Sequence, residues 1–254
     1  MVSLQKASIS KRIIAAIFDG IIVSIIAVGL IALLSVAFNT DKHLNTYQQA
    51  YTKYSTEYEV NLTLEEYNAL TESERKEYND RALQAEEAFA ADMDAVYAYN
   101  MFINLSLLII TLGVLIGVVL VEFVVPLFFG NGQTLGKKVF GIALMHKESI
   151  KVSNLQLFIR AVLGKFAIEL MIPIYILMMV YFNSIGVISV VVLLVILAAH
   201  IICLITTRTN SLLHDVMAGT VAVDMASQRI FDSREALIEY TKKLHAAEAQ
   251  KPTF

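Results

Sequence analysis

Four long apolar runs constrain the fold of this chain more than any other feature. Each run approaches or exceeds the ~20 apolar residues that a helix needs to cross the hydrocarbon core of a bilayer. Hydrophobic residues make up 57% of the sequence and charged residues only 17%, which is too apolar for a soluble domain of 254 residues. The sequence therefore predicts an all-α integral membrane protein with a four-helix transmembrane bundle. The predicted spans cover residues 13–38, 101–129, about 161–182 and 185–205.

The third and fourth runs are separated only by Asn183 and Ser184. Two interpretations follow: a tight helical hairpin, or one continuous helix through both runs. The polar pair and the nearby Gly186 favour the hairpin, because polar residues and glycine mark turns. We therefore expect residues 161–206 to form two spans joined by a short turn.

Basic residues in the short flanks predict the orientation of the spans, because lysine and arginine accumulate on the cytoplasmic side. They lie before the first span, between the second and third, and after the fourth. These residues are Lys6, Lys11, Arg12, Lys137, Lys138, Lys147, Lys151, Arg160, Lys165 and Arg208. We therefore expect a multi-pass protein of the cell membrane with both termini in the cytoplasm. Residues 1–38 would hold the cytoplasmic N-terminus and first span, and residues 101–130 the second span.

Residues 39–100 would then form an acidic extracytoplasmic insertion, with thirteen acidic residues against five basic ones. The segment contains no glycine and has two capping boxes, Thr63 with Glu66 and Thr71 with Glu74, so it is predicted to be helical. One interpretation is a solvated acidic cap. The others are a docking surface for an extracytoplasmic partner and a vestibule that concentrates cations.

Residues 131–160 and 207–254 are predicted to lie in the cytoplasm. The sequence after Gly130 lacks the glycine and the hydroxyl residue of a phosphate-binding loop, so a nucleotide site is not expected. Residues 139–145 and 150–152 resemble a short hairpin, and residues 219–225 are a third candidate strand. Residues 232–250 have the pattern of an amphipathic surface helix.

Two apolar runs carry a glutamate followed four residues later by a proline: Glu122 with Pro126, and Glu169 with Pro173. A proline in a helix has no N–H for the carbonyl four residues earlier. Each proline is therefore expected to free the backbone oxygen of the glutamate and to kink the helix. Each glutamate becomes a candidate cation or proton site.

Depth counting places one titratable group of each span in a common layer. Counted from the predicted cytoplasmic ends, Asp19, Glu122, Glu169 and His200 fall roughly 8–12 Å into the membrane. Ionisable residues within spans normally face a bundle interior or a wet cavity. The layer could therefore bind ions or protons, act as structural polar contacts, or hold a lipid head group or small solute.

Simpler interpretations exist for individual members of this layer. Lys165 and Glu169 are four residues apart and could pair with each other on one helix. Arg12 could reach out to water, or it could neutralise Asp19 or Asp215. His200 could be a packed polar residue, and its spacing from Cys203 is insufficient to indicate a metal site, so no metal is expected.

Three stretches together resemble the RDD family of membrane proteins. They are Arg12 and Asp19 in the first span, the sequence from Gly132 to Gly141, and the sequence from Leu213 to Thr220. The arginine and two aspartates of the family name would be Arg12, Asp19 and Asp215. The resemblance covers about residues 8–38 and 101–225. The chain departs from the usual plan of the family by its long acidic insertion and a clear fourth span.

The resemblance implies two kinds of function. Some RDD proteins are described as monovalent cation/proton antiporters, and others as partners or regulators of membrane proteins. We therefore expect a small-ion transporter that moves sodium, potassium or protons, with a noncatalytic adaptor as the alternative. No enzyme motif, cofactor or nucleic-acid partner is expected. The expected partners are the lipid bilayer, a second copy of the chain in a homodimer, and an extracytoplasmic or membrane protein.

Overall fold

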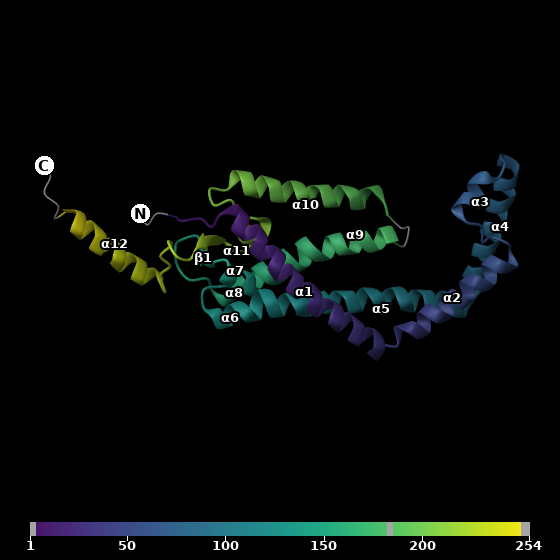
Figure 1. Ribbon diagram of the computed structural model, residues 1–254, viewed down its shortest axis with the longest axis horizontal. Coiled ribbons are helices and arrows are strands. Elements are labelled where there is room, and N and C mark those ends of the chain that lie inside the picture. Colours follow the sequence, from purple (N-terminus) through teal and green to yellow (C-terminus); the bar gives the residue numbers. More distant parts are fainter. Residues whose placement is uncertain (1–3, 182–184, 250–254) are drawn as a thin grey trace. The chain divides into compact units, whose positions relative to one another are not determined.

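The computed structural model describes residues 4–181 and 185–249 and is mostly helical (Figure 1). Four helices are long and apolar enough to cross a membrane: Ile9–Ala37, Met93–Phe129, Asn154–Tyr181 and Val187–Thr206. The prediction of a helical protein with four candidate spans is confirmed. The sides of the membrane on which the connecting segments lie remain a prediction.

The third and fourth candidate spans are separate helices, as the hairpin interpretation requires. The helix α9 (Ile172–Tyr181) ends the third span, and α10 (Val187–Thr206) forms the fourth. The two helices contact each other and lie side by side in Figure 1. The predicted turn residues Asn183 and Ser184 lie outside the described residues.

The chain forms two compact units, and the division cuts through two helices. One unit comprises Val28–Leu112, and the other comprises the chain before and after it. The first boundary falls within α1 (Ile9–Ala37) and the second within α5 (Met93–Val118). The predicted insertion, residues 39–100, lies entirely within the first of these units.

Both spans that carry the glutamate–proline pattern leave α-helical geometry at that pattern. In the second span, α5 passes into a π-helical segment, η1 (Val119–Val124), and then into α6 (Val125–Phe129). In the third span, α8 (Asn154–Phe158) is followed by the π-helical η2 (Ile159–Met171) and by α9.

Each proline is the second residue of the α-helical segment that follows a π segment. Pro126 follows η1 in this way, and Pro173 follows η2. A proline cannot donate to the carbonyl four residues earlier, and a change of helical register is one way to accommodate it. Glu122 and Glu169 therefore lie in the two π segments, where the backbone pairing differs from that of an ordinary helix.

A two-stranded antiparallel sheet packs beside the helices of the larger unit. Strand β1 (Ile142–His146) pairs with β2 (Thr220–Asp224), with Leu144 opposite Ala222. The core beneath the sheet contains Ala7, Ala15, Ile142, Leu144, Leu157 and Ala222. The short helices α7 (Leu135–Val139) and α11 (Leu213–Ala218) precede the two strands.

The predicted hairpin of residues 139–145 and 150–152 is confirmed at its turn, where the His146 N–H donates to the Ile150 carbonyl oxygen, but its first strand begins later than predicted. Val139 closes α7, and Gly141 takes a left-handed φ of 63°, so the strand begins only at Ile142. Residues after the turn make isolated bridges, with Lys151 opposite Met145. The partner of β1 over its full length is the predicted third strand. This confirms that residues 219–225 contribute to the sheet.

The unit Val28–Leu112 contains three helices besides its parts of α1 and α5. They are α2 (Thr40–Glu57), α3 (Leu64–Ala69) and α4 (Glu72–Ala91). Thr63 and Thr71 form the two predicted capping boxes, with Glu66 and Glu74 returning hydrogen bonds to the backbone. The sequence analysis did not identify α2 separately. The predicted tail helix is present as α12 (Arg234–Ala249).

We predict that Gly164→Ala destabilises the larger unit, because Gly164 lets α11 approach η2. A Cβ atom there would lie 2.5 Å from Cβ and 2.8 Å from Cα of His214. The expected loss is about 1–3 kcal/mol, as for other overpacked sites. Gly29→Ala is the matched control, since nothing lies within 4 Å of its added Cβ. Thermal unfolding in detergent should separate the two variants, and equal melting temperatures would contradict the close packing.

Candidate functional site

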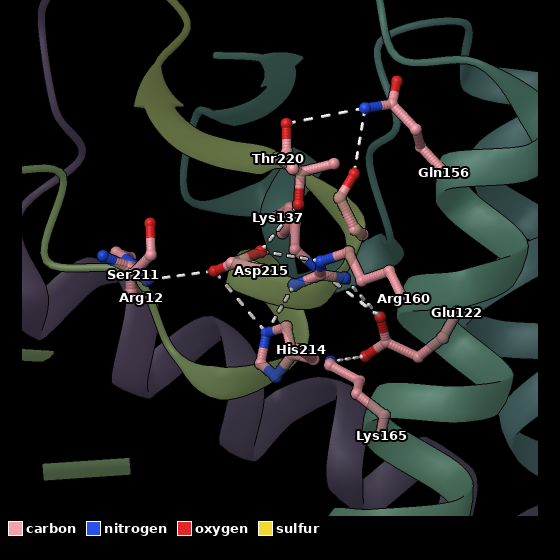
Figure 2. A network of polar contacts seen from close by, with 12 residues as sticks. Arg12, Glu122, Lys137, Gln156, Arg160, Lys165, Ser211, His214, Asp215 and Thr220 are labelled. Atoms are coloured by element: carbon pink, nitrogen blue, oxygen red, sulfur yellow. Dashed lines mark hydrogen bonds and ion pairs between the residues drawn. The ribbon is translucent and has the colours of Figure 1, made fainter. Parts of the chain in front are cut away.

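A buried network of charged side chains joins six elements of the larger unit (Figure 2). The four spans supply seven of its ten members, and the short helices before the two strands supply the other three. The residues are Arg12 and Asp19 from α1, Glu122 from η1, Lys137 from α7, Arg160, Lys165 and Glu169 from η2, His200 from α10, and His214 and Asp215 from α11.

Arg160 lies at the centre of this network. Its Nε donates to Asp215 Oδ1 at 2.9 Å and its Nη1 to Glu122 Oε2 at 3.2 Å. Its Nη2 lies 2.9 Å from His214 Nε2. The side chain is almost completely buried, so these three partners replace the water that the guanidinium has lost. Figure 2 shows Arg160 between Asp215 and Glu122.

Asp215 accepts hydrogen bonds from two arginines and a hydroxyl group. Arg12 Nη2 lies 3.2 Å from Asp215 Oδ2, and Thr220 Oγ1 donates to Asp215 Oδ1 at 3.1 Å. Burial is the largest single influence and would favour the neutral acid, but the charges and hydrogen bonds of Arg160, Arg12 and His214 together outweigh it and hold the pKa of Asp215 well below its usual value. Asp19 and Asp215 were the two partners predicted for Arg12, and the structure pairs Arg12 with Asp215.

Asp19 binds the start of α7 instead of pairing with Arg12. It accepts hydrogen bonds from the Thr134 hydroxyl and, at 2.7 Å, from the Gly136 N–H. A Cβ atom at Gly136 would collide with the Ala15 carbonyl oxygen and lie 3.0 Å from the Asp19 carboxyl carbon. This contact requires a glycine at position 136, in the middle of the stretch that resembles the family.

Lys137 points into a set of oxygen atoms from three elements. Its Nζ lies 3.1 Å from Thr134 Oγ1, 3.5 Å from Glu122 Oε2 and 3.9 Å from Asp19 Oδ2. Burial lowers the pKa of Lys137 from 10.5 to about 7, despite the opposing effect of Glu122. The ammonium can therefore lose its proton near neutral pH.

Glu122 is surrounded by positive charge. Besides Arg160 and Lys137, it pairs closely with Lys165, and only 4% of its side chain is exposed. The predicted pairing of Lys165 with Glu169 along one helix is therefore not observed. Lys165 reaches across to the second span, because that carboxylate is the more deeply buried of the two.

Glu169 binds two histidines, and the geometry specifies their protons. His200 Nδ1 lies 2.8 Å from the Ile196 carbonyl oxygen, which can only accept, so Nδ1 carries a proton. His200 Nε2 lies 3.0 Å from Glu169 Oε1, another acceptor unless it is protonated. One further proton must therefore be shared by Glu169 and His200.

His214 is held in one neutral form. Its Nε2 faces Arg160 Nη2, which can only donate, so Nε2 must accept. Its Nδ1 then carries the proton and donates to Glu169 Oε1 at 2.7 Å. Burial lowers the pKa of His214, in agreement with a neutral ring.

Two cavities of different size border the network. A cavity of about 680 Å³ lies along α1, α5 and the third span, and Glu122, Lys165, Glu169 and His214 form its polar part. A cavity of about 50 Å³ lies toward the sheet, next to Lys137, Ile142 and Ala222. The two cavities share wall residues, which are Ala16, Lys165, Leu212 and His214. Lys165 and His214 thus separate the two spaces.

The four residues predicted to form a common layer fall into two linked groups. Asp19 and Glu122 both lie near Lys137, whereas Glu169 and His200 pair with each other. The link between the groups runs through Arg160 and His214. Sequence reasoning did not select Lys137, Arg160, Lys165 or His214 as site residues. Their only signals were the cluster of basic residues between the second and third spans and the position of His214 beside Asp215.

The described residues contain no group of three or more His, Cys, Asp or Glu side chains that could hold a metal ion. The oxygen atoms around Lys137 come from only two carboxylates and one hydroxyl, and a charged amine already lies among them. Such a set does not resemble the site of a resident divalent metal.

Four apolar helices with a buried ion-pair network at one end define an α-helical integral membrane protein. A model of the RDD family matches residues 6–219. The chain therefore belongs to the RDD family, and the matched range contains Arg12, Asp19 and Asp215. Searches of curated proteins and of solved structures gave no match.

We predict that Asp215→Asn is strongly destabilising, because it leaves Arg160 and Arg12 buried without this carboxylate. Breaking a buried pair typically costs ~3–5 kcal/mol. Asp232→Asn is the control: Asp232 pairs with Lys151 but is 80% exposed, so its loss should cost at most about 1 kcal/mol. The yield of folded monodisperse protein in detergent tests this, and equal yields would contradict a structural role for Asp215.

The lowered pKa of Lys137 predicts a pH-dependent stability. The unfolded chain takes up this proton below pH 10.5, but the folded protein takes it up only below about pH 7. The stability contributed by neutral Lys137 is therefore complete above pH 10.5 and is lost as the pH falls to about 7. Relative to Lys137→Met, the melting temperature of the wild type should decrease over this range and then level off. A difference that is independent of pH would contradict the prediction.

Proposed function

We propose that this protein exchanges a monovalent cation for a proton across the membrane, and that the exchange takes place where the Lys137 ammonium lies. The observation that carries the proposal is the set of three oxygen atoms around Lys137 Nζ, from Thr134, Glu122 and Asp19. Carboxylate and hydroxyl oxygens are also ligands for alkali cations. A sodium or potassium ion could therefore replace the ammonium.

The charge balance of the network supports a one-for-one exchange. Without Lys137, the buried network carries three positive and three negative charges, since the Glu169–His200 pair with its shared proton is neutral. The charged members are Arg12, Arg160 and Lys165 against Asp19, Glu122 and Asp215. A protonated Lys137 adds one positive charge, and a monovalent cation in its place would add the same. A cation can thus bind without extra buried charge only when Lys137 has released its proton.

The two cavities support access to this position from two sides. The larger cavity reaches Glu122 and Lys165 from the apolar spans, and the smaller one reaches Lys137 from the side of the sheet. Movement of Lys165, which borders both, would connect them. In this proposal Lys165 acts as the barrier, which opens when Glu122 exchanges its pairing with Lys165 for pairing with an arriving cation.

The Glu169–His200 pair is the proposed second proton carrier. It holds one shared proton, Glu169 lines the larger cavity, and both side chains are about one-fifth exposed, at 18% and 22%. Glu122 lines the same larger cavity as Glu169. Protons could therefore reach the buried network from the larger cavity without crossing the apolar bundle.

This proposal revises the role expected for the four-residue layer. Glu122 and Asp19 remain candidate cation ligands, but Glu169 and His200 become proton carriers, and Lys137 becomes the group that links the two ions. The location in the cell membrane, with both termini in the cytoplasm, is retained as part of the proposal because the basic residues gather on one side of the spans.

We predict that Lys137→Arg abolishes the exchange without preventing folding. An arginine preserves the positive charge but does not lose its proton at accessible pH. In proteoliposomes with an inward sodium or potassium gradient, the wild type should move protons outward, and the variant should not. Lys138→Arg is the matched control, because Lys138 is exposed beside the Phe129 ring.

Two results would contradict the proposed function. The first is a wild type that shows no cation-dependent proton movement above that of empty vesicles. The second is a folded Lys137→Arg variant that transports as well as Lys138→Arg. The second result would leave cation/proton exchange as the function but would show that Lys137 does not release the exchanged proton.

A further inference from the structure

The unit Val28–Leu112 contains a cavity that is separate from the charged network and from the two cavities beside it. It has a volume of about 580 Å³ and lies along α2 and α4, with Tyr99 of α5 completing it. Six of its side chains are aromatic: Tyr47, Tyr51, Tyr54, Tyr78, Phe89 and Tyr99. This volume is within the range of cavities that bind small molecules. We call it the tyrosine groove.

The aromatic rings of the tyrosine groove form a connected group. Tyr47 has its ring centroid 5.3 Å from that of Tyr99 and 6.0 Å from that of Phe89, and Phe89 lies 6.2 Å from Tyr54. Tyr54 Oη donates to Asp92 Oδ2 at 2.9 Å, which holds that ring in place. The rings therefore form a pre-arranged wall with little freedom to collapse onto one another.

The chemistry of this wall favours a positively charged ligand. The face of an aromatic ring attracts cations, and Lys53 Nζ already lies 4.7 Å from the centroid of the Tyr54 ring. Of the described residues that line the groove, Glu86 is acidic and none is Lys, Arg or His. The surrounding segment, residues 39–100, has thirteen acidic and five basic residues. An anion would find hydroxyl donors here but no basic side chain, and Glu86 would repel it, whereas a cation would find aromatic rings and a carboxylate.

We propose that the tyrosine groove binds a small organic cation, with an ammonium group against the tyrosine rings and its carbon groups over the apolar floor. Ala82 and Ala85 lie at the floor, where their small side chains leave room for such a body. An inorganic ion would use little of this volume and would retain its water. The proposal is independent of cation exchange at Lys137, because none of the residues of the charged network lines the groove.

Binding can be measured through the protein's own fluorescence. The chain contains no tryptophan and 11 tyrosines, of which five line the groove, so ligand binding there should change a large share of the emission. The probe is choline, titrated into the full-length protein in detergent. The matched control is 3,3-dimethyl-1-butanol, which has the same shape without the charge. We expect a saturable change with choline and at least about tenfold weaker binding of the neutral compound.

Variants of Tyr51 test the role of the ring, since this residue is 57% exposed and contributes little to the core. Tyr51→Phe keeps the ring face and should bind choline within about twofold of the wild type, while Tyr51→Leu should bind about tenfold more weakly. Glu86→Gln should also weaken binding. Tyr97→Leu is the control, because Tyr97 is similarly exposed, at 60%, but does not line the groove.

Three outcomes overturn the inference. Choline could fail to bind, the two compounds could bind equally well, or Tyr51→Leu could behave as Tyr51→Phe. Equal binding would indicate an apolar groove suited to a neutral partner, such as an apolar side chain of another protein. Lys137→Arg should bind choline as the wild type does, so a failure of cation exchange and a failure of this site give different results.

Discussion

The bridge from Asp215 through Arg160 to Glu122 is the interaction on which the rest of the larger unit depends. Arg160 is buried, and so are the two carboxylates that it joins. Isolated charges at such depth would each cost several kcal/mol, so each member needs the others to remain ionised. The bridge ties the third span to the second span and to α11. Gly164 permits the close approach of α11 and η2 that places His214 and Asp215 beside Arg160.

The sequence was sufficient to predict what depends on local pattern. Hydropathy identified four spans, and the capping boxes at Thr63 and Thr71 and the tail helix were found from short-range rules. Residues 139–145 and 219–225 were both candidate strands, but their patterns could not show that β1 pairs with β2 over its whole length, because some seventy residues separate the strands and a nearer candidate existed in residues 150–152. Short-range patterns cannot choose between two partners for one strand.

In the candidate site, too, local patterns could be predicted from the sequence but long-range pairing could not. Depth counting selected Asp19, Glu122, Glu169 and His200, all of which make ion pairs in the structure, but it could not indicate which basic side chains they meet. Arg160 and Lys165 were counted among the basic residues that flank the spans. Their side chains instead turn inward to Glu122, which they neutralise together with Lys137. Partner choice among several lysines and arginines depends on packing, which the sequence alone does not display.

The two units of the chain carry different kinds of polar site. The larger unit concentrates compensated charges in a buried network, where, in the proposed function, a proton on Lys137 controls whether another cation fits. The unit Val28–Leu112 carries excess negative charge and an aromatic groove at its surface. The charge of Lys137 can change near neutral pH, because burial opposes its ammonium form more than its oxygen neighbours support it. The central claim is therefore that cation binding and proton release are one event at Lys137.

The direct measurement is proton release at equilibrium. Purified protein in weakly buffered detergent solution near pH 7 is titrated with sodium or potassium chloride, while bound cation is counted with a radioactive tracer and the pH is recorded. The account predicts about one proton released for each cation bound by the wild type, and neither binding nor release by Lys137→Arg. Cation binding without proton release, or equal release by the variant, would contradict it.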